Sequence, residues 1–245
     1  MHKNSTILNT RSSLQAGITQ EVFAQAGYPV INFPCLQIVA TSDKDKSAGL
    51  LKNTEHYNVV IFTSQNAVIY AFKLYPNWRI DESCHVIAVG LKTAQCLEQQ
   101  IKNFIWMPQS QNSQGVIELL QGLNKVPKIT LITAKNGRNL IQNYARDNNI
   151  ALQQINVYQR IKPNVNKIKL LELEKTEKLI ILATSVTIVK NLISLLPKSL
   201  LKKVKGQTLL CASSRISDYA KQQGFSNTRN CHSANPENML KFLSI

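Results

Sequence analysis

The sequence has few acidic residues, few glycines and none of the common nucleotide-binding or hydrolase motifs. Its 245 residues include 14 Asp and Glu against 29 Lys and Arg, and 9 glycines. Neither GxGxxG nor GxxxxGK[ST] occurs, so a dinucleotide fingerprint and a P-loop are excluded. There is no GxSxG, and no set of Ser, His and Asp stands out. No carboxylate follows a predicted strand as an obvious general base, so little acid–base chemistry is indicated.

Paired cysteines and clustered histidines are also missing. The chain contains no CxxC and no HxxxH, and its four histidines are scattered. A disulfide framework or a zinc site needs closer or paired spacings, so we expect neither disulfides nor a metal site. The odd set of five cysteines fits small buried residues better, and it consists of Cys35, Cys84, Cys96, Cys211 and Cys231.

Long apolar runs are absent as well. The longest, Leu179–Leu196, is interrupted by Thr, Ser, Lys and Asn and is too polar to span a bilayer. The opening "MHKNSTILNTRSS" lacks the apolar segment of a signal peptide. We therefore expect a cytoplasmic protein without a membrane partner. Aromatic residues do not alternate with basic ones as in RNA-binding sheets, so a nucleic-acid platform is not indicated.

What the chain has in excess is positive charge. The net charge is +15, and residues 123–245 contribute +14 of it, with 20 basic against 6 acidic residues. Such an excess favours an anionic partner, for example a polyanionic small molecule. Nucleic acid is an alternative on charge alone, and it predicts binding that weakens steeply with salt.

The two halves of the chain repeat each other. "VVIFTS" and "IILATS" end in the pairs Thr63-Ser64 and Thr184-Ser185, which lie 121 residues apart. At nearly the same offset, "ILNTR" aligns with "TLITAK", and "VIAVGLKTAQCL" aligns with "LLCASSRISDYA". The common order of these matches indicates an internal duplication.

Each half alternates short apolar runs with longer amphipathic segments. The runs are rich in Val and Ile and apolar at nearly every position, which is typical of parallel strands covered on both faces. This alternation predicts an α/β fold with right-handed crossovers. The predicted strands are Thr6–Asn9, Val30–Pro34, Val59–Phe62, His85–Val89, Lys128–Ile132, Gln153–Tyr158, Leu179–Ala183 and Thr208–Ala212.

Small polar and basic residues follow these strands. Ligands of open parallel sheets bind beyond the carboxyl ends of the strands, where helix N-termini present free N–H groups to anions. The same Ser, Thr and Asn residues also suit helix caps, and the sequence leaves both roles open. The candidate binding residues are Thr63, Ser64, Asn66, Gly90, Lys92, Thr93, Thr184, Ser185, Ser213 and Arg215, with Arg11 and Arg138 as weaker candidates.

Several of these segments resemble the uroporphyrinogen-III synthases. The resemblance lies in "FTSQNAV", "AVGLKTAQCL", "LITAKNGRNLI", "NVYQR" and "CASSRISDYAKQQGF", and it extends in order over essentially the whole chain. It implies two flavodoxin-like parallel-sheet domains with a cleft between them. Applied to this chain, residues 1–38 with 160–245 form one domain and residues 39–159 form the other. The segments "VINFPCLQIV" and "INVYQRIKP" are the expected extended linkers.

The resemblance also implies a reaction. The family cyclises hydroxymethylbilane, a linear tetrapyrrole with eight carboxylates, to uroporphyrinogen III, a step of heme biosynthesis. Water is lost and ring D is inverted, which makes the enzyme a cyclising, cofactor-independent lyase. Tyr158 in "NVYQR" matches the tyrosine proposed to assist departure of the hydroxyl group. We expect a monomer that makes transient contact with the upstream synthase.

A second function fits the same residues. Two α/β domains around a cleft also describe a non-enzymatic protein that binds a polyanionic small molecule. Tight binding without turnover would distinguish it from the enzyme.

Overall fold

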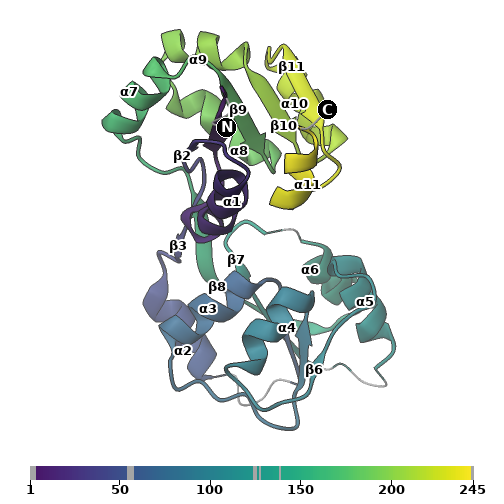
Figure 1. Cartoon of the computed structure of the whole chain (residues 1–245). Helices are drawn as coiled ribbons and strands as arrows, with labels where there is room; N and C mark the ends of the chain where they lie inside the picture. The colour runs from purple at the N-terminus through teal and green to yellow at the C-terminus, as the bar shows by residue number, and fades with distance from the viewer. Residues whose placement is uncertain (1–3, 54–57, 124–125, 127, 138, 244–245) are drawn as a thin grey trace. The chain divides into compact units, whose positions relative to one another are not determined.

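The computed structural model describes residues 4–53, 58–123, 126, 128–137 and 139–243 (Figure 1). The chain divides into two compact units: unit 1 is Met1–Gln37 with Ile161–Ile245, and unit 2 is Ile38–Arg160. These borders differ by one residue from those in the predicted division. The chain passes from one unit to the other within strands β3 (Gln37–Ala40) and β8 (Ala151–Ile161).

Unit 1 contains a five-stranded sheet in the order β11-β10-β9-β1-β2, whose neighbouring strands are parallel. The central strands β1 and β9 are apolar and almost wholly buried, which fits a sheet covered on both faces. Its elements are β1 (Thr6–Asn9), α1 (Ser13–Gln25), β2 (Val30–Asn32), α7 (Lys167–Lys175), β9 (Leu179–Ala183), α8 (Val186–Leu195), α9 (Lys198–Lys205), β10 (Thr208–Cys211), α10 (Ser214–Gln222), β11 (Asn227–Asn230) and α11 (Pro236–Lys241).

Unit 2 contains a six-stranded sheet in the order β3-β8-β7-β4-β5-β6, and the pairs from β8 to β6 are parallel. Strand β4 is buried at all four positions and lies at the centre beside β7. Besides β3 and β8, the unit consists of α2 (Lys44–Lys52), β4 (Val59–Phe62), α3 (Gln65–Leu74), β5 (His85–Ala88), α4 (Leu91–Glu98), β6 (Ile105–Trp106), α5 (Ser113–Gln121), β7 (Lys128–Ala134) and α6 (Leu140–Asp147).

The two units share one arrangement and exchange strands between the halves of the chain. Unit 1 joins β2-β1 from the first half to β9-β10-β11 from the second. Unit 2 joins β8-β7 from the second half to β4-β5-β6 from the first and adds β3 at its edge. Unit 1 follows the flavodoxin-like order 2-1-3-4-5, and unit 2 has the same spatial arrangement with β8-β7 in the place of β2-β1, although there these two strands come last in the chain. The sequence repeat is therefore a repeat of strands, with β1 matching β7 and β4 matching β9.

Helices cover both faces of each sheet. In unit 1, α7, α8, α9 and α10 bury apolar side chains on one face, and α1 and α11 bury theirs on the other. In unit 2, α2, α3 and α4 cover one face, and α5 and α6 cover the other. Burial on both faces explains why the strands read as continuous apolar runs. The predicted α/β fold with parallel sheets is confirmed.

Strands β3, β6 and β11 were absent from the prediction. All three lie at sheet edges, which bury little of their surface; β6 has only two residues, and β11, with the sequence NTRN, has no apolar pattern. Helix α9 buries Leu200 and Val204 and exposes Lys198 and Lys202. Strand β8 extends to Ile161, three residues beyond its predicted end.

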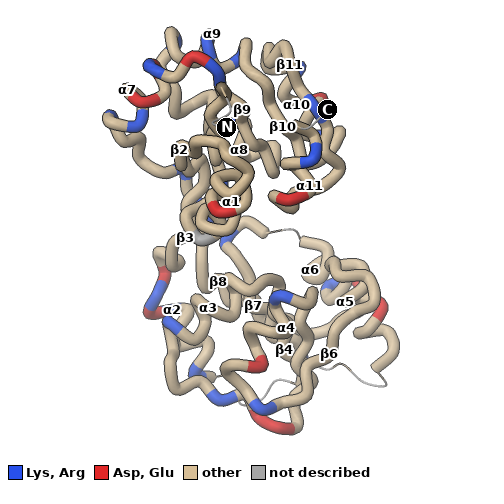
Figure 2. The backbone as a smooth tube through the Cα atoms, viewed as in Figure 1, with Lys and Arg blue, Asp and Glu red and all other residues tan. Residues whose placement is uncertain are grey.

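Charge is unevenly divided between the units. Unit 1 carries 16 Lys and Arg against 6 Asp and Glu, a net of +10, and unit 2 carries 13 against 8, a net of +5. Basic residues gather along helix α9, whose last turn contains three lysines (Figure 2). Among the described helices, none is both long and apolar enough to pass through a lipid bilayer.

Candidate active site

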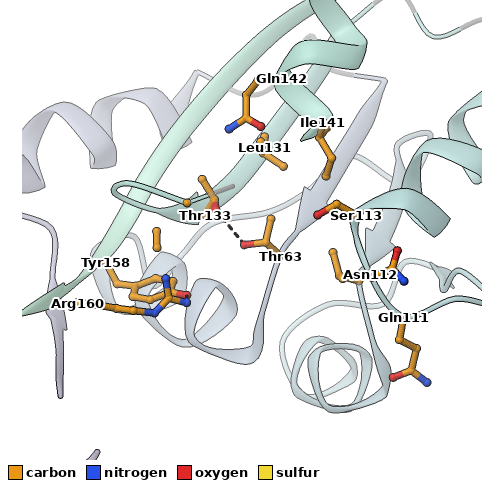
Figure 3. A pocket seen from close by; sticks show the side chains of 13 residues that line it. Thr63, Gln111, Asn112, Ser113, Leu131, Thr133, Ile141, Gln142, Tyr158 and Arg160 are labelled. Atoms are coloured by element: carbon orange, nitrogen blue, oxygen red, sulfur yellow. Dashed lines mark hydrogen bonds between the residues drawn. The ribbon is translucent and has the colours of Figure 1, made fainter. Parts of the chain in front are cut away.

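A polar cavity opens at the carboxyl ends of strands β4, β7 and β8 in unit 2 (Figure 3). Its volume is about 450 Å³, which lies within the range of small-molecule sites. Strands β7 and β4 are neighbours here, and they correspond to strands 1 and 3 of a flavodoxin-like sheet. This is the topological switch point, where ligands of such folds bind. The position in the fold and the polar lining both identify the cavity as a candidate site.

Two threonines form the floor of the cavity between β4 and β7. Thr63 Oγ1 lies 3.0 Å from Thr133 Oγ1 and 3.2 Å from the carbonyl oxygen of Ile132 (Figure 3). A hydroxyl group has a single proton to donate. If Thr63 gives its proton to the backbone carbonyl, the Thr133 hydroxyl can donate to Thr63 or to a ligand. The floor therefore offers hydroxyl donors on rigid strand ends.

Tyr158 lies at the side of the cavity with its phenol held on three sides. The residue is 1% exposed, and its ring stacks on Tyr70 with centroids 5.9 Å apart. The phenol oxygen is 3.0 Å from Ser64 Oγ and 3.0 Å from Nη2 of Arg160. The guanidinium carbon of Arg160 also lies 5.4 Å from the ring centroid. The orientation of the phenol is thus fixed before any ligand binds.

A β-bulge brings Tyr158 to this position. Strand β8 pairs Asn156 with Thr133 and then Tyr158 with Ala134, so that Val157 is the extra residue. In a regular strand, successive side chains point to opposite faces. Because the bulge breaks this alternation, both Val157 and Tyr158 are buried in the same hydrophobic cluster. Bulges often redirect a side chain beside an active site, and this one turns the phenol toward the cavity.

The loop before α5 closes another side of the cavity. Asn112 caps the helix, and its Oδ1 accepts bonds from the N–H groups of Gln114 and Gly115 at 2.8 and 3.1 Å. A Cβ atom on Gly115 would lie 2.1 Å from the carbonyl oxygen of Ser110. Glycine is therefore required for the close approach that brings residues 111–113 to the cavity.

The residues that line the cavity favour an anion. Arg160 supplies a positive charge, and none of the described lining residues is Asp or Glu. Hydroxyl and amide groups of Thr63, Thr133, Ser113 and Gln142 surround the remaining space. Carboxylates bind best to such hydrogen-bond donors with a cation close by.

Two of the candidates predicted in unit 2 take part in this site. Thr63 lines the cavity, and Ser64 both caps α3 through the N–H of Ala67 and contacts Tyr158. Gly90 caps α4, and a Cβ there would lie 2.9 Å from Oε1 of Gln111, a cavity residue.

The other predicted residues of unit 2 lie outside the cavity lining. Asn66 belongs to the first turn of α3, and Lys92 and Thr93 to the first turn of α4. Thr93 is buried in its helix, whereas Lys92 is exposed. Arg138 lies outside the described residues.

Five predicted residues lie at the carboxyl ends of the unit 1 strands instead. Ser185 caps α8 through the N–H of Ile188 at 3.2 Å, and Ser213 occupies the same position before α10. Thr184 directly follows β9, and Arg215 lies exposed in the first turn of α10. Unit 1 therefore has its own polar strand ends, which match those of unit 2.

Arg11 is the most buried cation at these strand ends of unit 1. Its Nε is enclosed and has no hydrogen-bond partner among the described residues. Burial lowers the pKa of the guanidinium, and the carboxylate of Glu237 partly opposes this shift. A guanidinium whose Nε is enclosed without a hydrogen-bond partner is suited to bind an anion.

Some cavity residues were missed from the sequence. Thr133 aligns with Thr10 in the sequence repeat and follows an apolar strand, which could have marked it as a candidate. Arg160 and the residues 111–113 carry no such signal. They reach the cavity through the end of β8 and through a loop that follows a two-residue strand.

Comparisons with known proteins agree with the expected family. The model of the family described as "Uroporphyrinogen-III synthase HemD" matches residues 18–241. A curated relative, "Porphyrin biosynthesis protein HemD" of Ruminiclostridium josui, is 23% identical over 170 residues, which make up 66% of this chain and 34% of that protein. The aligned region thus spans about a third of the relative's length.

Solved structures show the same fold over the whole chain. A uroporphyrinogen-III synthetase from Helicobacter pylori is 16% identical, with a TM-score of 0.67 and 98% of each chain covered. A mutant uroporphyrinogen III synthase from Thermus thermophilus is 13% identical, with a TM-score of 0.59 and 98% of this chain and 97% of that one covered. Because the family model covers nearly the full length in the expected order, this chain belongs to the uroporphyrinogen-III synthase family.

Proposed function

We propose that this chain converts hydroxymethylbilane to uroporphyrinogen III, with loss of water and inversion of ring D. Membership of the family supports the reaction, and the cavity supports the chemistry. The observation that carries the proposal is the phenol of Tyr158, held by Ser64 and Arg160 at the wall of a polar cavity. That group is a proton donor beside a site suited to carboxylates.

The cavity in unit 2 is proposed to hold one end of the substrate. A volume of about 450 Å³ suits a pyrrole ring with its carboxylate arms rather than the whole tetrapyrrole. The hydroxyls of Thr63 and Thr133 are proposed to bind those carboxylates or the ring that carries them. The polar strand ends of unit 1 are proposed to bind further carboxylates, as the resemblance implies. The residues concerned are Arg11, Thr184, Ser185, Ser213 and Arg215. Contacts with substrate carboxylates are also proposed for the other predicted residues of unit 2, which are Asn66, Gly90, Lys92, Thr93 and Arg138.

The first chemical step is loss of the hydroxyl group from the hydroxymethyl carbon of ring A. The C–O bond breaks as the pyrrole nitrogen supplies its electron pair, and the departing oxygen takes a proton to leave as water. Tyr158 is placed to give that proton, since a phenol near neutral pH is a protonated donor. A positioned general acid contributes roughly 10²–10⁴-fold in rate.

The remaining steps join carbon to carbon. The electrophilic carbon attacks the substituted carbon of ring D and forms a spiro intermediate, whose reopening and reclosure reverse the ring. Ring D finally loses one hydrogen as a proton, which balances the proton given to the departing hydroxyl. The overall reaction removes one water molecule and is redox-neutral, so we propose that no cofactor takes part. Holding the two chain ends together supplies much of the rate.

The precursor also closes without help, and it then gives the isomer in which ring D is not reversed. We therefore propose that the protein meets its substrate close to the synthase that releases it. We also propose that it works as a monomer in the cytoplasm. Gel filtration at micromolar concentration tests the monomer directly.

The function is tested by the isomer that is formed. Hydroxymethylbilane is generated in place from porphobilinogen by its synthase, and the products are oxidised and separated by chromatography. The proposal expects predominantly type III porphyrin with this protein and type I without it. Type I under both conditions would show that the chain does not catalyse the reaction. Tight binding of the bilane in that case would identify a binding protein instead.

A further inference from the structure

We propose that Arg160 is a positioning residue that directs the proton of Tyr158 toward the departing hydroxyl group and stabilises the charge left on the phenol oxygen. This inference deepens the proposed function and rests on it. It is carried by the contact between the two side chains.

The geometry joins Arg160 to Tyr158 in two ways. The residues are two apart on β8, and side chains at that spacing share one face of a strand. Nη2 of Arg160 donates to the phenol oxygen at 3.0 Å, and the guanidinium carbon lies 5.4 Å from the ring centroid. A planar guanidinium that makes both contacts has little freedom to turn away.

The hydrogen bond from Arg160 determines where the phenol proton points. Arginine can only donate, so this bond occupies a lone pair of the Tyr158 oxygen. The single phenol proton must then point to another acceptor. At rest Ser64 Oγ, at 3.0 Å, lies within reach of that proton, and it also accepts from the N–H of Ala67 at 3.2 Å. A substrate hydroxyl in the cavity can take the place of Ser64.

The charge of Arg160 acts when the proton leaves. Transfer of the proton to the departing hydroxyl turns the phenol into a phenolate, and the bond from Nη2 then joins two opposite charges. Hydrogen bonds of this kind are shorter and roughly twice as strong as neutral ones. The interaction is therefore stronger in the transition state than in the resting state, which is the condition for faster catalysis.

Other roles for Arg160 are less well supported. Among the described residues, none of the ion pairs involves Arg160, so it is not held as half of a surface salt bridge. A direct contact with a substrate carboxylate is the main rival, because Arg160 also lines the cavity. The two roles differ in what they change: a carboxylate contact affects KM, whereas action through Tyr158 affects kcat.

The test compares Arg160→Gln in two backgrounds, the wild type and Tyr158→Phe. In the wild type we expect kcat for the type III isomer to fall about ten- to a hundredfold, the range of a hydrogen bond to a charged group, with little change in KM. In the Tyr158→Phe background the same substitution should have almost no further effect, since the phenol through which it acts is missing. Arg160→Lys keeps the charge and should retain more activity than Arg160→Gln.

Two controls separate this role from a loss of folding. Arg146→Gln removes an arginine of the same unit that is exposed and paired only with Asp147, and it should leave kcat unchanged. Because Arg160 is exposed, each Arg160 variant should unfold in urea with a midpoint close to the midpoint of its own background, either the wild type or Tyr158→Phe.

The inference is overturned if Arg160→Gln lowers kcat equally in both backgrounds, or raises KM alone. It is also overturned if the wild type makes the type III isomer and Arg160→Gln does not lower its kcat. A wild type that makes no type III isomer instead refutes the proposed function, and the inference then fails with it.

Discussion

Replacing Tyr158 with phenylalanine removes one oxygen atom from the candidate active site and leaves the packing intact. The ring is 1% exposed and stacks on Tyr70, and both conditions persist in the variant. Arg160 is exposed and can turn to water, and Ser64 still accepts from the N–H of Ala67. Since no buried group loses its last partner, the free energy of unfolding should fall by about 0.5–1.5 kcal/mol. For a chain of this length that lowers Tm by roughly 2–4 °C per kcal/mol.

The effect on catalysis should be much larger than the effect on stability. Without the phenol, the departing hydroxyl must take its proton from water, so we expect kcat for type III formation to fall by about 10²–10⁴. Unaided closure of the bilane then competes, and the share of type I isomer should rise. Both values come from the coupled assay with chromatographic separation of the oxidised isomers.

Tyr70→Phe is the matched control. Its hydroxyl donates to the carbonyl oxygen of Ile38 at 2.9 Å, and Tyr70 is absent from the cavity lining. The two variants should therefore lose similar stability, while Tyr70→Phe keeps its activity. If Tyr158→Phe is no slower than Tyr70→Phe, the phenol has no role in proton transfer and the reasoning from its position is wrong.

Three further predictions concern packing, capping and thiols. Gly115→Ala should cost about 1–3 kcal/mol and lower activity, because its Cβ meets backbone at 2.1 Å, whereas Gly17→Ala in open space on α1 should be neutral or stabilising in urea unfolding. Ser185→Ala removes a helix cap of 3.2 Å and should cost about 1 kcal/mol, whereas Ser64→Ala removes an equivalent cap and also the hydrogen bond to Tyr158, so it should cost about 0.5–1.5 kcal/mol more; equal losses in urea unfolding would contradict the contact between Ser64 and Tyr158. Burial raises the pKa of the Cys211 thiol to about 12 and that of Cys231 to about 11. Both values exceed the ordinary thiol pKa of about 8.5, so the unfolded chain loses these protons at a lower pH than the folded one. The contribution of the two thiols to the free energy of unfolding should therefore be constant below a pH of about 8.5 and decline above it. A free energy of unfolding that does not decline up to about pH 11 would refute the raised pKa values.

The sequence predicted the site in part, and the successes have a common cause. Thr63 and Ser64 follow a strand that is apolar throughout, and polar residues after such a strand must lie at its carboxyl end. Tyr158 came from the resemblance to the family, not from its position in a strand. The misses also share a cause. Gln111 and Asn112 reach the cavity through a loop, and Arg160 lies in the part of β8 beyond its predicted end at Tyr158, so no apolar run marks either position.

The sequence by itself determined the α/β class, the parallel sheets and the duplication, because continuous apolar runs require burial on both faces and repeat at a fixed offset. Only the tertiary structure decided how the repeats are used. Unit 1 takes two strands from the first half of the chain and three from the second, and unit 2 takes four from the first half and two from the second, since β1 pairs with β9 and β7 pairs with β4. It also decided the position of Tyr158, through a bulge at Val157 opposite Thr133 and Ala134 that leaves no mark in local sequence. Strand pairing joins residues far apart in the chain, and a pattern along the chain cannot specify which partners meet.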